Sequence, residues 1–128
     1  MTHVDEESAV RSLSAAEIVA AEWSAVLSYG PDLIDPAVPR TAYAHPPLRC
    51  LHPMVSHGVL YLSRCTRWPR THDVGTVYPL AEGGYRVRRE SDRTLLGEAD
   101  TVEAAYELVA ARLPDGCGPA IDGTSDDL

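Results

Sequence analysis

The chain has 128 residues, of which 45% are hydrophobic, and a formal net charge of −8 at pH 7. This length suits one domain with one core, and this composition is that of a globular protein, not a disordered one. No apolar run approaches the roughly 20 residues that a membrane span needs. The acidic start "MTHVDEES" does not have the pattern of a signal peptide.

Three cysteines are present, Cys50, Cys65 and Cys117. Their odd number and the lack of a C-x-x-C pair favour a reduced, cytoplasmic setting over a disulfide framework. Their individual roles stay open. The His and Cys spacing matches no zinc pattern, and no phosphate-binding glycine loop is visible. We therefore expect neither a metal nor an organic cofactor.

The first predicted helix begins at Ser14. "LSAAEI" reads as a capping box, with Ser14 as N-cap and Glu17 at the third helical position. Apolar residues then recur at helical spacing from Val19 to Leu27, and Gly30-Pro31 ends the helix. Residues 1–12 are predicted to be a flexible N-terminus.

The next segment, residues 31–57, contains six of the ten prolines. A long helix is excluded there, because proline removes a backbone donor and clashes with the preceding turn. A short helix over residues 39–44 is compatible with the pattern. The remainder is predicted to be an irregular connection over the core.

From Val59 the apolar pattern changes to a period of two, which predicts strands. The alternation "VLYLSRC" places Val59, Tyr61 and Cys65 on one face, which we predict to be the core face, and Arg64 on the other. Further strands are expected at "TVYPLA", "YRVRRE" and "TLLGEA", joined by "EGG" and "SDR" turns.

A second helix is predicted over residues 101–113, with Asp100 as its cap and Glu103 in its first turn. Pro114 ends it. Residues 13–114 then form a single domain, and residues 115–128 form an acidic C-terminal tail that we expect to be mobile.

The predicted fold class is α+β: a small antiparallel β-meander of three to four strands with two α-helices covering one face. The residues expected to share one core are Val19, Trp23, Val26, Val59, Tyr61, Val102, Tyr106, Val109 and Leu113.

Arginine is concentrated in the middle of this acidic chain. All basic residues are arginine, and residues 40–93 hold nine of the eleven against four acidic residues, a net charge of +5. Such a cluster either binds an anionic or polar partner or is neutralised by the chain's own acids. The predicted binding residues are Arg64, Arg67, Trp68, Arg70 and Arg88. A solvated strand face is the alternative, and nucleic-acid binding is disfavoured by the acidic chain.

Two histidines are candidate catalytic residues. His57 precedes the first strand and His72 lies in the arginine-rich loop, and either can accept a proton near pH 7. Ordinary loop hydrogen bonding is the competing role for both. Cys65, next to Arg64, is a weaker candidate nucleophile, because a buried position favours an inert thiol.

Several segments together resemble a small uncharacterised family of high-GC bacteria whose members are usually named natural-product biosynthesis proteins. They are "SHG", "SRCT", "LGEAD" and "LPDGCGP", and the resemblance covers roughly residues 20–128. It implies a biosynthetic context and transfers no catalytic residue. A more distant similarity is to the small proteins that help form lysinoalanine cross-links in lanthipeptides.

The functional hypothesis is a small cytoplasmic accessory or tailoring protein of natural-product biosynthesis. It would bind a peptide or a polar or anionic intermediate at the Arg/His/Trp-rich surface. A non-catalytic protein–protein interaction module and a lysinoalanine-type cross-linking helper are the alternatives. Whether a reaction is catalysed, and whether the chain forms a homodimer, stay open.

Overall fold

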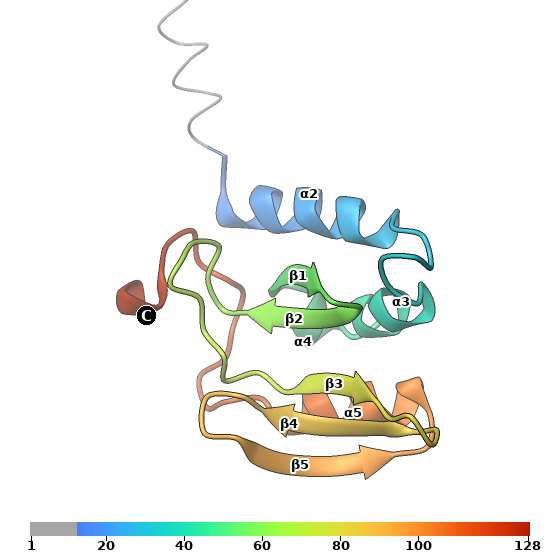
Figure 1. Cartoon of the computed structure of the whole chain (residues 1–128). Coiled ribbons are helices and arrows are strands. Elements are labelled where there is room, and N and C mark those ends of the chain that lie inside the picture. The colour runs from blue at the N-terminus through green and yellow to red at the C-terminus, as the bar shows by residue number, and fades with distance from the viewer. Residues whose placement is uncertain (1–12) are drawn as a thin grey trace, which may run out of the picture.

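The computed structural model describes residues 13–128 and has the α+β architecture predicted from the sequence (Figure 1). The elements in chain order are α2 (Ala15–Leu27), α3 (Ala37–Tyr43), α4 (Pro46–Arg49), β1 (His52–Ser56), β2 (Val59–Ser63), β3 (Thr76–Pro79), β4 (Tyr85–Arg89), β5 (Thr94–Ala99), α5 (Val102–Ala111) and the short 3-10 helix η1 (Ser125–Asp127). The predicted flexible N-terminus, residues 1–12, lies outside the described residues. Within the described part, no helix is long and apolar enough to cross a membrane.

The strands form two small antiparallel sheets, where the sequence had predicted one meander. One sheet is the β1–β2 hairpin, and the other has the order β3-β4-β5. The two lie next to each other at β2 and β3 without forming a ladder (Figure 1). The long loop over residues 64–75 separates them, so Arg64 and Arg88 do not belong to one continuous sheet face as expected.

Strand β1 was missed because it lies in the proline-rich segment. Pro53 is opposite Leu62 in the hairpin register. Because β1 pairs with another strand on one side only, a residue without an N–H is tolerated in it. His57 and Gly58 form the two-residue turn to β2, both with positive φ, of 52° and 74°. Such a turn suits the twist of a two-stranded hairpin.

The period of two in β2 is correct, but its core face was assigned wrongly. Leu60 and Leu62 are buried, whereas Val59 and Tyr61 are only half-buried. Arg64 follows the strand on the same side as these leucines. Its charge had led us to assign that side to solvent, but a salt bridge to Asp73 neutralises the charge. Cys65 is also buried, so the end of β2 is covered on both faces.

Both predicted helices are present, and the capping residue of one of them differs from the prediction. The capping box of α2 is present, with Ser14 and Glu17 bonded to each other's backbone N–H groups. Helix α5 is capped by Thr101, whose hydroxyl accepts from Ala104 N, and not by Asp100 as predicted. Helix α3 corresponds to the short helix expected before Pro46, and α4 adds one further turn.

One core joins the two sheets. Helix α2 packs against β1, and α5 packs against all three strands of the second sheet. Trp23 is 1% exposed and its indole N–H donates to Leu51 O at 3.0 Å. Of the nine predicted core residues, six are buried and Leu113 packs at the edge. Val59 and Tyr61 are replaced by their neighbours Leu60 and Leu62.

The acidic C-terminal segment is attached to the fold, where we had expected a mobile tail. Ala120 is buried and its N–H donates to Cys50 O at 2.9 Å. Ile121 forms an isolated parallel bridge with Cys65. The segment, red in Figure 1, therefore lies beside the loop that follows β2.

Candidate functional site

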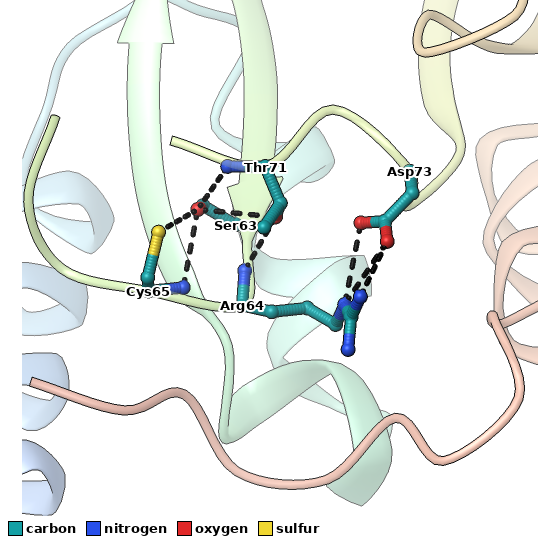
Figure 2. Close-up of polar contacts among 5 residues, drawn as sticks. All are labelled: Ser63, Arg64, Cys65, Thr71 and Asp73. Atoms are coloured by element: carbon teal, nitrogen blue, oxygen red, sulfur yellow. Dashed lines mark hydrogen bonds and ion pairs between the residues drawn. The ribbon is translucent and has the colours of Figure 1, made fainter. Parts of the chain in front are cut away.

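The arginine-rich loop over residues 64–75 is held by a buried serine at the end of β2. The Ser63 hydroxyl accepts the backbone N–H groups of Cys65 and Thr71, each at 3.2 Å (Figure 2). The Thr71 hydroxyl in turn accepts from Arg64 N at 2.8 Å. Because Ser63 is only 3% exposed, these bonds replace water for groups that would otherwise be unsatisfied.

Arg64 is neutralised inside the same loop. Its Nε and Nη2 atoms bond the carboxylate of Asp73, with Nη2 to Oδ2 at 2.7 Å (Figure 2). This hydrogen bond to Asp73 raises the pKa of the Arg64 guanidinium further. A fork-to-carboxylate pair of this kind fixes geometry as well as charge. Arg64 therefore closes the loop and has little capacity left for a ligand.

Arg67 is neutralised by the C-terminal segment. Its Nε lies 3.2 Å from Asp122 Oδ1, and the Thr66 hydroxyl donates to the same oxygen at 2.8 Å. The backbone continues this contact, because Thr66 N and Arg67 N donate to the carbonyls of Ile121 and Gly123. The acidic tail thus supplies part of the charge that offsets the cationic middle of the chain.

Arg88 is neutralised next to its own strand. Its Nη2 lies 3.1 Å from Glu90 Oε2, and its guanidinium lies over the ring of Tyr78, 5.5 Å from the centroid. Tyr78 OH also donates to Glu90. Burial, followed by this hydrogen bond, raises the pKa of Tyr78. Arg88 therefore belongs to an internal network on the second sheet.

Arg70 differs from these three arginines. Its Nη1 lies 2.6 Å from His52 Nδ1, and no carboxylate within residues 13–128 forms an ion pair with it. The Nε atom is shielded from solvent and has no hydrogen-bond partner. The guanidinium lies over the ring of Trp68, 5.4 Å from its centroid. Trp68 itself is 64% exposed.

His52 is a neutral partner for this arginine. It is 5% exposed, and burial, assisted by the charge of Arg70, lowers the pKa of His52 to about 4. At pH 7 its imidazole is therefore uncharged, and Nδ1 accepts the proton of the arginine Nη1. His52 thus does not offset the charge of Arg70, and neither Nε nor Nη2 of Arg70 has a hydrogen bond to a protein acceptor in the described chain.

The two candidate bases lie apart from each other. His57 occupies the tip of the β1–β2 hairpin, where Ser56 Oγ lies 3.0 Å from its Nδ1. His52 pairs with Ser63 at the other end of the hairpin. The strand from His52 to Ser56 spans about 13 Å, at roughly 3.3 Å per residue over four steps, so His57, one residue further, lies at the opposite end of the hairpin from His52. His72 is exposed in the loop, and its carbonyl accepts from Ser91 N.

The cysteines are free thiols. Cys65 is fully buried, with its Sγ 3.6 Å from each of two carbonyl oxygens, those of Arg67 and Pro69. Such a setting suits a packed thiol more than an exposed nucleophile. Burial raises the pKa of the Cys117 thiol, against the opposing effect of Arg64. In the described chain, no three His, Cys, Asp or Glu side chains gather as a metal site would require.

Three cavities lie elsewhere on the molecule. One of about 290 Å³ lies between α2, α4 and the C-terminal segment, and one of about 640 Å³ lies between α3 and α5. A third, of about 190 Å³, lies at the turn between β3 and β4. The predicted site residues line none of these three. Arg70 and Trp68 thus lie on a surface outside them.

Comparison with known proteins gives one match. The model of a family of unknown function, DUF6193, matches residues 17–124, which extend from the first turn of α2 to the segment beside Arg67. The chain belongs to this family. No curated protein and no solved structure matches the chain. The DUF6193 match thus includes every predicted site residue but assigns none of them a role.

One residue of this candidate site was missed from the sequence. His52 lies in the proline-rich segment that was expected to be irregular, so its burial and its position opposite Ser63 were not foreseen. The available signal was weak: "CLHPMVS" alternates apolar and polar residues in part, but Pro53 argued against a strand.

Proposed function

We propose that this protein binds a carboxylate group of a peptide or a polar biosynthetic intermediate through Arg70 and Trp68. The observation that carries the proposal is the isolation of the Arg70 charge. Arg64, Arg67 and Arg88 each have a carboxylate partner, whereas Arg70 contacts a neutral histidine and an exposed indole. A half-buried cation without a counter-charge is costly, and an anionic ligand would relieve that cost.

The chemistry of recognition follows from the free edge of Arg70. Nε and Nη2 of a guanidinium form the fork that bonds both oxygens of a carboxylate, as Arg64 does with Asp73. Because Nε is shielded from solvent, Nη2 is the atom of this edge that a ligand carboxylate would bond first. Trp68 is exposed, and its ring offers a flat contact for an apolar or planar group next to that carboxylate.

The biosynthetic context rests on the resemblance of four segments to proteins named for natural-product biosynthesis. In that context the protein is a cytoplasmic accessory that presents or protects an anionic intermediate. The cross-linking alternative gains no support from the geometry. It requires a base beside a peptide groove; His57 lies at the hairpin tip, away from Arg70, and His72, in the same loop as Arg70, lines none of the three cavities described.

A protein–protein interaction module is the second candidate, and one observation favours it. Trp68 and Arg70 lie on a surface outside the three cavities described, and exposed Trp and Arg side chains are the types that dominate binding energy at interfaces. In that case the carboxylate belongs to an acidic side chain of the partner protein.

The test compares two acetylated peptides that differ only in charge, one rich in Glu and the other with Gln at the same positions. Titration followed by tryptophan fluorescence should show binding of the Glu peptide. Arg70→Gln should weaken it about tenfold, since a charge-assisted fork is lost. Arg86→Gln is the matched control, because Arg86 is exposed and paired with Glu98. Equal affinity for both peptides, or an equal loss in both variants, would refute the proposal.

A further inference from the structure

The cavity of about 290 Å³ between α2, α4 and the C-terminal segment has the composition of a small-molecule site. Its walls are almost entirely apolar. The lining residues are Ala16, Val19, Ala20, Trp23, Tyr43, Pro46, Arg49, Cys50, Pro119 and Ala120. Small-molecule sites typically combine such apolar walls with a few polar groups that fix orientation.

Two aromatic rings shape this cavity. Trp23 and Tyr43 meet edge to face, with centroids 5.2 Å apart and an interplanar angle of 66°. The indole N–H of Trp23 is already bonded to Leu51 O and the side chain is only 1% exposed, so Tyr43, which is 37% exposed, offers most of the aromatic surface to a ligand. An aromatic ligand ring can pack against such a pair in a stacked or T-shaped arrangement.

A single charge lies at this cavity. Arg49 stacks on Tyr43 with its guanidinium 5.0 Å from the ring centroid, and its Nε donates to Tyr43 O at 2.9 Å. These two contacts fix the direction of the side chain. Within residues 13–128, neither Nη atom has a protein acceptor, and none of the lining residues is acidic. Among the described residues, the cavity therefore has a positioned cation and no anion.

We propose that this cavity binds a small aromatic carboxylate, with the ring packed beside Tyr43 against the apolar wall and the carboxylate on the Nη atoms of Arg49. The volume limits the ligand, because about 290 Å³ equals about ten water volumes of roughly 30 Å³ each. A single-ring acid fits this limit and a peptide does not. This site is separate from Arg70 and does not depend on the function proposed for it.

The experiment uses phenylacetate as the probe, with phenylacetamide and 2-phenylethylamine as ligands of matched shape. Binding to the full chain is followed by NMR at the Trp23 indole N–H. Phenylacetate should shift this signal with saturation, and the amide and the amine should bind about tenfold more weakly or worse, because the amide is a neutral acceptor without the carboxylate charge and the ammonium group offers Arg49 no acceptor.

Matched variants locate the site. Ala20→Leu should fill the cavity and abolish binding, whereas Ala21→Leu, one position along the same exposed helix surface, should not. Arg49→Gln should weaken binding about tenfold, since the charged donor is lost. Arg40→Gln should not, although Arg40 also donates from Nε to a backbone carbonyl, at 3.1 Å.

Three results would overturn the proposal: no saturable shift with millimolar phenylacetate, equal binding of phenylacetamide, or unchanged binding in folded Ala20→Leu protein. Arg70→Gln separates this inference from the proposed function. It should leave phenylacetate binding unchanged, and a loss of phenylacetate binding in that variant would contradict the assignment to the Arg49 cavity.

Discussion

Arg70 Nη1 lies 2.6 Å from Nδ1 of His52, and this bond joins the arginine-rich loop to the first strand of the β1–β2 hairpin. His52 is buried and neutral at pH 7, so it positions the guanidinium without neutralising it. The other predicted site arginines are held by carboxylates. Of the four arginines predicted to bind, Arg70 is therefore the one without a carboxylate partner among the described residues.

The first prediction concerns the pH dependence of stability. The pKa of His52 is about 4 in the folded protein, below the value of about 6.5 for an unperturbed histidine. Between about pH 6.5 and 4, His52 therefore binds a proton in the unfolded chain but not in the folded chain. The contribution of His52 to the free energy of unfolding is complete above about pH 6.5 and is lost as the pH falls towards 4.

His52→Asn tests this prediction, because the Asn carbonyl can accept from Arg70 in place of Nδ1 but does not titrate. Urea unfolding at pH 7.5 and 5.5 should show a smaller decrease in stability for the variant than for the native chain. Equal decreases in the two proteins would show that His52 is not the titrating group.

The second prediction concerns Ser63. Ser63→Ala should lower the free energy of unfolding by about 2–6 kcal/mol, because the N–H groups of Cys65 and Thr71 lose their acceptor at about 1–3 kcal/mol each. Ser24→Ala, on the exposed face of α2, is the control and should change stability by less than about 0.5 kcal/mol. Denaturant unfolding measures both. A Ser63→Ala effect as small as the control would mean that the serine does not anchor the loop.

The third prediction is a substitution that stabilises the protein. Tyr106 is 1% exposed, and its buried hydroxyl has no hydrogen-bond partner among residues 13–128. Burial also raises the pKa of this hydroxyl. Tyr106→Phe removes this unsatisfied group and keeps the ring, so it should be neutral or stabilise by about 1 kcal/mol. Thermal and urea unfolding check the sign. A loss above about 1 kcal/mol would reveal a partner for the hydroxyl.

The fourth prediction concerns the C-terminal segment. Deleting residues 121–128 removes the acceptors of Thr66 N and Arg67 N. Hydrogen exchange of these two amides should then accelerate, since their protection depends on the closed backbone contact. Asp122→Asn removes only the side-chain charge and should leave both amides protected. Protection that survives the deletion would show that the tail does not hold the loop.

The sequence predicted the elements with strong local signals. The capping box at Ser14, the glycine turn before Tyr85 and the apolar stripe of α5 are all determined by neighbours within a few residues. The division into two sheets was not predictable in this way. It depends on the course of residues 64–75 and on a strand that contains Pro53, which local preference argues against.

In the candidate site too, features set by neighbouring residues were predictable and contacts between distant residues were not. The concentration of arginines in the segment after β2 was visible in the sequence, and the structure places the Arg70 guanidinium over the Trp68 ring. Which arginine lacks a carboxylate could not be predicted, because the decisive partners are distant in sequence. Asp122 and its partner Arg67 are 55 residues apart in the sequence, and His52 and its partner Arg70 are 18 residues apart.

The most direct test of the central claim observes the Nε–H signals of the arginines by NMR while the Glu-rich peptide is added. The Arg70 signal should move with saturation and the Arg64 and Arg67 signals should stay, because their forks are already occupied by Asp73 and Asp122. A stationary Arg70 signal, or equal movement of all three, would contradict the assignment of the carboxylate site to Arg70.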